Sequence, residues 1–374
     1  MKLHEDKTLF TQLLNFAANA LNIRPEFIEK DYWLTRALQR MAQNKNTEKV
    51  VFKGGTSLSK AYRLTNRFSE DIDIAVIDAD SFSGNQLKML IKRLAKDMAS
   101  DLEEKVVQGI TSKGSRFYKA IYQYQNLVAP TLSAVKTGQL LIEINTYANP
   151  YPYVKQEISS FMADYFTTIN RQDMIEQYEL KPFLINVLDK RRTIIEKLVS
   201  LIRFSFENDI QKALASKIRH FYDLYYLAND VQCSEYINSA DFQKDLSELL
   251  INDQQEFDRP SGWQTKTIED SPLFTEFSAL WTGLSSAYQN ELEPLAFSEI
   301  PDEKLVAESF MKIIEKLLIR TCIEAGCPTG GVVLDPFMGA GTTAVVAKEL
   351  ERNFIGIELN SDYIRLAEER LGSV

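Results

Sequence analysis

The sequence has few cysteines and no long apolar run. Its three cysteines, an odd and sparse set, do not suit a disulfide framework and fit a reducing cytosol. Cys322 and Cys327 have no nearby histidine or second cysteine pair, which argues against a zinc site. No apolar stretch approaches the roughly 20 residues that cross a bilayer, and the N-terminus MKLHEDKTLF lacks the apolar core of a signal peptide. These absences predict a soluble, cytoplasmic protein without a membrane partner.

Positive charge is also scarce, but it is unevenly distributed. The net charge of −9 argues against a generally basic nucleic-acid binder. Residues 181–219 nevertheless contain nine Lys/Arg against four Asp/Glu, whereas residues 230–304 contain four against sixteen. The basic band either holds a phosphate-rich ligand or is a solvated helix face. The acidic stretch favours solubility or a basic partner, and the 374 residues suffice for two or three domains.

The run from Phe52 to Val76, FKGGTSLSKAYRLTNRFSEDIDIAV, is the most informative part of the chain. Side chains of a β-strand alternate between its faces, so Asp71 and Asp73 point the same way. Two carboxylates about 7 Å apart on one face repel each other unless a cation lies between them. The pattern therefore indicates a metal site, although a solvated strand end would carry the same residues.

A glycine-rich turn precedes these aspartates. Gly54, Gly55, Thr56 and Ser57 are expected to expose N–H groups and hydroxyls that suit a phosphate. A Gly-Gly pair alone indicates only a turn, but a phosphate cradle followed by paired carboxylates is typical of phosphoryl or nucleotidyl transfer.

A third carboxylate comes from the strand-like segment QLLIEINTY, residues 139–147. Glu143 is its one acidic residue, and burying it without a partner would cost several kcal/mol. If this strand lies beside Asp71 and Asp73, Glu143 becomes a third metal ligand; the alternative is a solvent-facing position on a half-exposed sheet.

The remaining pattern predicts a nucleotidyltransferase-like half followed by a helical half. Helices are expected in 7–43, 58–64 and 85–107, strands in 50–53, 69–77, 117–124 and 139–147, and mainly helices from about residue 178. In the helical half, Lys190 and Lys197 share one helix face, and Arg219 and Asp223 lie one turn apart. Structural ion pairs have the same spacing, so position alone leaves their role open.

Several strings in combination resemble the AbiEii/AbiGii nucleotidyltransferase toxins: IEKDYWLTRAL, the Phe52–Val76 run, LIEIN, EKL and RHFYDLYYL. The resemblance covers about residues 5–318. It implies an α/β (α+β) fold, with a DNA-polymerase-β-like mixed sheet and flanking helices over 1–177 and a helical domain over 178–318. It also implies a toxin of a toxin–antitoxin or abortive-infection (phage-defence) system, with a cognate antitoxin as partner.

The resemblance further implies the reaction and its residues. A nucleotide would pass from a nucleoside triphosphate to an RNA acceptor, taken to be a tRNA 3′ end, with release of pyrophosphate. Asp71, Asp73 and Glu143 would bind Mg²⁺ or Mn²⁺ and, with Lys197 and Asp223, form the catalytic set. The nucleotide-binding residues would be Gly54, Gly55, Thr56, Ser57, Lys60, Lys190 and Arg219.

The last residues, 319–374, carry a different signature. They read as strand, glycine loop, helix, strand, helix, and DPFMGAGTT resembles the S-adenosylmethionine motif of amino DNA methyltransferases. That resemblance implies a cofactor loop lined by Asp335, Phe337, Gly339 and Gly341, with Glu358 on the cofactor ribose.

The rest of a methyltransferase is missing from the pattern. The nearest string to its target-binding loop, Asn149-Pro150-Tyr151-Pro152-Tyr153, breaks the motif, and two strands cannot bury both faces of a sheet. S-adenosylmethionine is therefore not expected to be used catalytically by this chain alone. The alternative function is a DNA adenine or cytosine-N4 methyltransferase, or half of a split one. A third alternative is a binding module that has lost catalysis, against which the three retained carboxylates speak.

Overall fold

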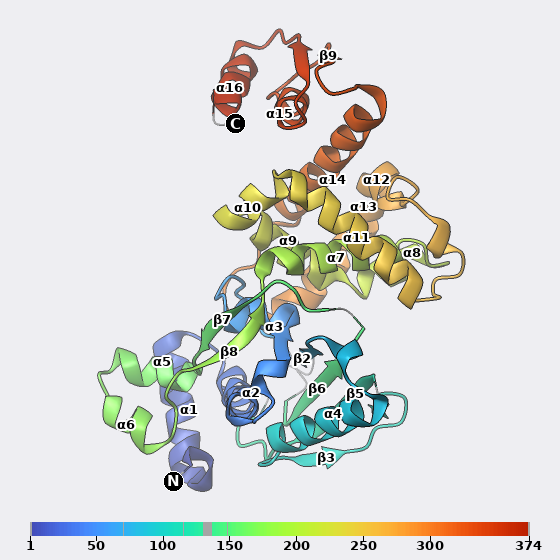
Figure 1. The fold of residues 1–374 in the computed structure, drawn as a ribbon. Coiled ribbons are helices and arrows are strands. Elements are labelled where there is room, and N and C mark those ends of the chain that lie inside the picture. The colour runs from blue at the N-terminus through green and yellow to red at the C-terminus, as the bar shows by residue number, and fades with distance from the viewer. Residues whose placement is uncertain (1, 70, 115, 130–136, 148, 373–374) are drawn as a thin grey trace. The chain divides into compact units, whose positions relative to one another are not determined.

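The computed structural model describes residues 2–69, 71–114, 116–129, 137–147 and 149–372. Contacts divide the chain into two compact units (Figure 1). Unit 1 comprises Met1–Thr193 and Asn290–Ile300, and unit 2 comprises Ile194–Gln289 and Pro301–Val374. The domain boundaries expected near residues 177 and 318 stay predictions.

Unit 1 is built on a mixed β-sheet. Its described residues form eight strands in the order β3-β5-β6-β2-β1-β8-β7, with β4 paired to β5. The strand bounds are β1 Val50–Lys53, β2 Asp71–Val76, β3 Glu103–Lys105, β4 Ser112–Lys113, β5 Phe117–Gln123, β6 Gln139–Asn145, β7 Tyr153–Ile158 and β8 Phe183–Leu188. β2 runs parallel to β6 and β1 parallel to β8, whereas β1–β2, β5–β6 and β7–β8 are antiparallel. The mixed α/β class expected from the sequence is confirmed.

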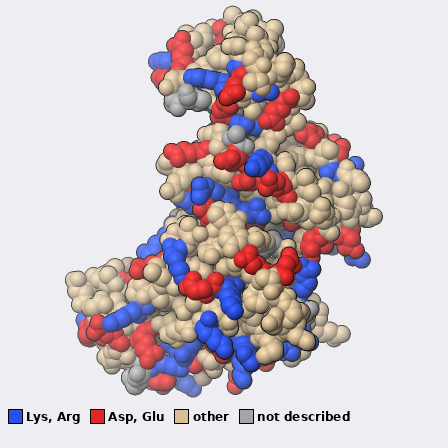
Figure 2. All heavy atoms as spheres, in the orientation of Figure 1, with Lys and Arg blue, Asp and Glu red and all other residues tan. Residues whose placement is uncertain are grey.

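Helices cover the apolar face of this sheet. The helices of unit 1 are α1 Lys7–Leu21, α2 Pro25–Gln43, α3 Gly54–Lys60, α4 Gly84–Met98, α5 Phe161–Thr168 and α6 Gln172–Gln177, and all of these except α3 contribute residues to the core on this face. Ile72 and Ile74 of β2 are fully buried in one core with Leu90 and Leu94 of α4. The alternation of β2 leaves its aspartates on the other face. The outer side of α4 is exposed, and Figure 2 shows Lys and Arg side chains over it.

A later segment returns to complete unit 1. The backbone N–H of Phe68 donates to Leu295 at 2.7 Å, and that of Phe297 donates to Asn66 at 2.8 Å. Phe27 stacks on Phe68 with ring centroids 5.0 Å apart, and Phe297 meets both edge-on. These contacts explain why residues 290–300 belong with the N-terminal sheet rather than with the helices that flank them in sequence.

Three secondary-structure predictions were wrong. The helix expected at 58–64 begins four residues earlier, so the predicted glycine turn is the first turn of α3. The helix expected at 85–107 ends at Met98 with β3 following, and the chain after 178 first forms β8 before it turns helical. β8, FLINVL, is a short apolar run whose periodicity does not separate a buried strand from a helix.

Unit 2 is mainly helical. Its helices are α7 Lys190–Phe204, which starts in unit 1, α8 Ile210–Ala215, α9 Ile218–Ala228, α10 Val231–Ile237, α11 Ala240–Glu256, α12 Pro272–Thr275, α13 Phe277–Leu292 and α14 Glu303–Gly326. An aromatic cluster joins three of them, with Phe310 of α14 lying 4.8 Å from Phe221 of α9 and 4.7 Å from Phe277 of α13, measured between ring centroids. Burial of such large aromatic side chains stabilises the packing of these three helices.

The C-terminal segment is a small extension of unit 2. It contains β9 Val332–Asp335, α15 Thr342–Glu349, β10 Asn353–Gly356 and α16 Ser361–Gly372, and β9 and β10 form a parallel two-stranded sheet. Val346 and Ala347 of α15 pack on Ile323 of α14, and Arg320 Nη2 lies 2.6 Å from Glu349 Oε2. The predicted order of strand, loop, helix, strand and helix is confirmed.

Among the described helices, none has the length and apolar character needed to span a membrane. The three cysteines are free thiols, with Cys233 buried, Cys327 half-buried and Cys322 exposed.

Candidate active site

Three carboxylates come together on two neighbouring strands of unit 1. In the parallel pair β2–β6, Asp73 lies opposite Glu143. Residues paired in this way point to the same face, and Asp71 shares that face because it precedes Asp73 by two positions. The expectation that Glu143 lies on the strand next to the two aspartates is confirmed. Its role as a metal ligand stays a prediction.

The negative charges of Glu143 and Asp71 make it harder for Asp73 to ionise. Burial, followed by the charges of Glu143 and Asp71, raises the pKa of Asp73 to about 7. Lys53, which lies opposite Asp73 on β1, and Lys119, opposite Glu143 on β5, act against this shift. Lys119 Nζ lies 3.1 Å from Glu143 Oε2. A cation bound between the carboxylates would therefore relieve a repulsion that the fold itself creates.

This donor set suits a hard divalent cation. Carboxylate oxygens are the ligands that Mg²⁺ and Mn²⁺ prefer. Within the described part of the chain, no three His, Cys, Asp or Glu side chains already form a group that could hold a metal ion. Asp71 and Asp73 are the residues that would hold it, with Glu143 joining them if its carboxylate leaves Lys119.

Gly54 brings the start of α3 against Asp73. Its φ of +80° lies in the left-handed region, and a Cβ atom added there would lie 2.3 Å from Oδ2 of Asp73. Any side chain at position 54 would thus displace the carboxylate as well as strain the backbone. The glycine is needed for this close approach, which is more specific than the tight turn expected from the sequence.

The hydroxyls that follow Gly54 are engaged within the fold. Thr56 Oγ1 donates to the backbone carbonyl of Asp71, and Ser57 Oγ donates to the carbonyl of Gly54 at 2.8 Å. Both side chains are buried, whereas Gly55 is half-buried. Thr56 thereby ties α3 to the first residue of β2. The predicted contacts of Gly54, Gly55, Thr56 and Ser57 with a triphosphate stay predictions.

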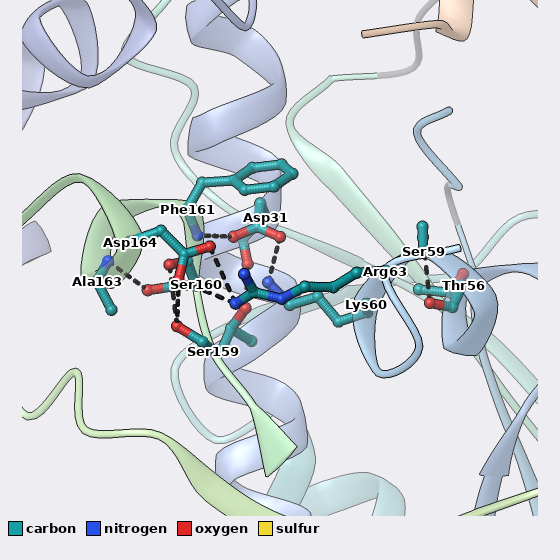
Figure 3. Close-up of polar contacts among 11 residues, drawn as sticks. Asp31, Thr56, Ser59, Lys60, Arg63, Ser159, Ser160, Phe161, Ala163 and Asp164 are labelled. Atoms are coloured by element: carbon teal, nitrogen blue, oxygen red, sulfur yellow. Dashed lines mark hydrogen bonds and ion pairs between the residues drawn. The ribbon is translucent and has the colours of Figure 1, made fainter. Parts of the chain in front are cut away.

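Lys60 forms a buried ion pair with Asp31 of α2 (Figure 3). The second carboxylate oxygen of Asp31 accepts the backbone N–H of Phe161 at 2.8 Å, so one side chain joins α2, α3 and the start of α5. Nearby, Arg63 Nη2 lies 3.1 Å from Asp164, to which Ser159 also donates. The predicted phosphate contact of Lys60 is untested, but in this structure its ammonium group serves the packing of α3.

In unit 2, Lys197 and Asp223 form the other buried ion pair among the predicted site residues. Their atoms Nζ and Oδ2 lie 2.6 Å apart, and the pair joins α7 to α9. Arg219 lies one turn before Asp223 on α9 and is half-buried, as is Lys190 at the start of α7. The structure thus brings Lys197 and Asp223 together, and the assigned roles of these four residues stay predictions.

Three residues of this region were not singled out from the sequence. Asp31 lies within the EKDY part of a helix that was interpreted only by its apolar positions. Lys53 and Lys119 flank the carboxylates because each occupies the strand position paired with one of them. Period-2 alternation could have placed Lys53 on the carboxylate face, but Lys119 could be placed only once the pairing of β5 with β6 was known.

In the C-terminal segment, Glu358 closes the glycine loop. Its carboxylate accepts the N–H of Gly339 at 2.8 Å and that of Asn360 at 2.7 Å. Asp335 accepts the N–H of Phe337 at 3.0 Å, and the Phe337 ring is 88% exposed. Gly341 approaches α16 so closely that a Cβ would lie 2.8 Å from Cβ of Ala367. Of the five residues predicted for S-adenosylmethionine, Phe337, Gly339 and Gly341 lie in the β9–α15 loop, Asp335 ends β9, and Glu358 lies between β10 and α16. Their binding role stays a prediction.

Comparison with known families identifies the family of the larger part of the chain. Residues 36–314 match the profile of a family described as the nucleotidyl transferase AbiEii toxin of type IV toxin–antitoxin systems. The chain belongs to the AbiEii family. The carboxylates of β2 and β6 lie within the matched AbiEii region, as do α7 and α9. Membership of this family groups the chain with nucleotidyltransferase toxins of type IV toxin–antitoxin systems.

A short segment of the AbiEii protein, toward its C-terminus, is similar to DNA methyltransferases. It is 49% identical over 63 residues to the type II methyltransferase M.SmaI of Serratia marcescens, a match that covers 17% of this chain and 22% of the methyltransferase. Matches over 54 residues at 50% identity link it to M.XycI of Xanthomonas campestris pv. cyanopsidis and M.Cfr9I of Citrobacter freundii, each covering 14% of this chain and 18% of the relative. The chain therefore spans about a fifth of the length of these methyltransferases.

Proposed function

We propose that the protein transfers a nucleotide from a nucleoside triphosphate to an RNA acceptor, a tRNA 3′ end, and releases pyrophosphate. The observation that carries the proposal is the register that sets Asp73 opposite Glu143, with Asp71 on the same face. Mutual repulsion within this set, expressed in the raised pKa of Asp73, favours a bound divalent cation. When bound, that cation supplies charge neutralisation at the reacting phosphate.

In the proposed transfer, the 3′ oxygen of the RNA attacks the α-phosphorus of the nucleotide. A new phosphorus–oxygen bond forms as the bond to the β-phosphate bridging oxygen breaks, and pyrophosphate leaves. Asp71 and Asp73 would hold the cation, and Glu143 would accept the proton of the attacking hydroxyl. Lys119, 3.1 Å from Glu143, stabilises that carboxylate as an anion until the proton arrives.

Cationic side chains are proposed to hold the triphosphate. Lys53 lies opposite Asp73 on β1, so its ammonium group is suited to the phosphates on the carboxylate face. By family resemblance, Lys190 and Arg219 are assigned to the same ligand. Lys197 and Asp223, paired at 2.6 Å, would act by fixing α9, which carries Arg219.

The test is transfer of radiolabel from each of the four nucleotides to total RNA in Mg²⁺, resolved by size. Wild-type protein should label one class of RNA, and Asp71→Asn and Asp73→Asn should reduce labelling by at least about a thousandfold. Asp80→Asn, an exposed carboxylate of the same unit, is the control and should leave labelling unchanged. Equal labelling by wild type and both site variants would refute the proposal.

The similarity to methyltransferases supports a second, weaker candidate, in which the C-terminal segment binds S-adenosylmethionine as half of a split enzyme. The favouring observation is that Glu358, which follows β10, accepts the N–H of Gly339 in the glycine loop that follows Asp335 and contains Gly341. Methylation by this chain alone is not proposed, because the described part of the segment has only the β9–β10 pair. Its test is the ligand titration given in the Discussion.

A further inference from the structure

The outer face of α4 collects positive charge in a protein that is negative overall. Lys88, Lys92, Arg93 and Lys96 are all exposed there, and Asp97 is the one acidic residue of the helix. Lys45 and Lys49, also exposed, line a cavity of about 240 Å³ together with Arg93. We call these six residues the α4 basic face. In Figure 2, blue side chains gather over this helix.

Acidic side chains of the fold do not neutralise these charges. Within the described ranges, none of the six forms an ion pair with an acidic side chain. The two neighbouring acids are occupied elsewhere: Glu48 Oε1 lies 2.5 Å from Lys155, and Asp97 accepts a hydrogen bond from Asn44 at 2.6 Å. Lys88, Lys92 and Lys96 are spaced by one turn and repel one another. A polyanion would remove that repulsion.

The cavity beside the basic face adds an apolar contact. Phe82, Met89 and Leu90 line it, and Lys49 Nζ lies 5.3 Å from the Phe82 ring centroid. The side chain of Met89 is 50% exposed although it is apolar. Cations around an aromatic and aliphatic floor suit a nucleic acid that places phosphates on the rim and one unstacked base on the floor.

We propose that the α4 basic face binds RNA and is the docking surface for the acceptor, an inference that rests on the proposed function. The carboxylates of β2 and β6 point away from α4, which packs on the opposite, apolar face of the sheet. An RNA that touches both must therefore pass around the sheet. The basic face accordingly selects a large folded RNA, and a short copy of the acceptor's 3′ end would reach the carboxylates without it.

The experiment measures RNA binding by the full chain without nucleotide or divalent cation, using fluorescence anisotropy of labelled bulk tRNA. The test variant is Lys92→Glu/Arg93→Glu/Lys96→Glu. The control, Lys212→Glu/Lys244→Glu/Lys266→Glu, makes the same change in net charge at exposed lysines of unit 2. The test variant should weaken binding at least about tenfold and flatten the dependence of log affinity on log salt by about two to three units. The control should change neither.

The outcomes separate this inference from the proposed function. Equal tRNA affinity for both triple variants would overturn the docking surface even if nucleotide transfer is observed. Loss of tRNA binding in the test variant alone would support it even if no transfer is found. Tighter binding of duplex DNA than of tRNA by the wild type would overturn the assignment to RNA. In transfer assays, the test variant should raise KM for tRNA but leave KM for the nucleotide and for a short oligonucleotide acceptor unchanged.

Discussion

Gly54 and Asp73 lie so close together that a Cβ atom added to Gly54 would clash with the Asp73 carboxylate. A Cβ on Gly54 would meet Oδ2 of Asp73 at 2.3 Å, and the φ of +80° at Gly54 disfavours any other residue. The start of α3 therefore fixes the position of the Asp73 carboxylate. The position of Asp73 depends on a residue that carries no functional group.

Gly54→Ala should abolish nucleotide transfer but lower the stability of the fold only moderately. The substitution displaces the Asp73 carboxylate and costs about 1–3 kcal/mol of backbone strain. Gly84→Ala is the matched control, because a Cβ there has open space and no strained φ. Transfer rates and thermal unfolding of the two variants provide the measurement. Wild-type activity in Gly54→Ala would show that the close approach is not required.

Asp73→Asn should stabilise the protein while inactivating it. The folded pKa of Asp73, about 7, exceeds the ordinary 3.8, so the folded state holds the proton over a range in which the unfolded chain has lost it. Stability of the wild type relative to the variant therefore falls as pH rises from about 4 to 7 and is then constant. Above pH 7 the variant should be more stable by about 1–3 kcal/mol, after allowance for solvent screening of this partly exposed group.

Chemical denaturation across this pH range in a chelator gives the measurement. Asp80→Asn, an exposed carboxylate of the same unit, should show no such pH-dependent difference. Adding Mg²⁺ should raise the unfolding temperature of the wild type but not that of Asp73→Asn, because the cation relieves the repulsion only where the third charge is present. A variant that is no more stable than the wild type at pH 8 would contradict the assigned repulsion.

The Asp31–Lys60 pair should behave as a structural element in a double-mutant cycle. Asp31→Asn and Lys60→Met should each lower the free energy of unfolding by about 3–5 kcal/mol, since each leaves a buried charge without its partner. The double variant should lose much less than the sum. The Arg63–Asp164 pair is the exposed control, for which about 1 kcal/mol or less is expected. A rise in nucleotide KM confined to Lys60→Met would instead support the phosphate contact predicted for Lys60.

Without the other half of a split methyltransferase, the C-terminal segment should bind S-adenosylmethionine no more tightly than about 1 mM, as measured by calorimetry on the full chain. Glu358, the residue expected to hold the ribose, already binds the N–H groups of Gly339 and Asn360. Val332, Leu334 and Ile355 of β9 and β10 remain more than half exposed, so this small sheet lacks the cover that a cofactor cleft requires. Saturable binding at about 0.1 mM or below that is lost in Glu358→Gln would contradict this expectation.

Much of the candidate site could be inferred locally. Asp71 and Asp73 share a face because alternation along a strand needs no information from the rest of the fold. Gly54 was likewise visible, as part of an expected tight turn. Its close approach to Asp73 could not be predicted, because the intervening sequence does not show how α3 packs against β2.

Pairing between distant segments came only with the tertiary structure. Glu143 lies opposite Asp73 because β6 is inserted between β2 and β5, and Lys60 is paired with Asp31 because α2 is buried beside α3. β8 escaped detection for the same reason. Its mostly apolar residues form a strand because β1 and β7 flank it, and their periodicity alone does not demand one.

The sequence thus indicates which functional groups the protein has, whereas their arrangement in space depends on the tertiary structure. Carboxylates and glycines at short spacing indicate phosphoryl or nucleotidyl transfer, because side-chain direction within one strand or helix is a local property. Which lysine faces a carboxylate and which supports the fold depends on strand order and burial, which minimise the free energy of the whole unit. Lys119 beside Glu143 and Lys60 beside Asp31 are the same residue type with opposite uses, and only the packed sheet tells them apart.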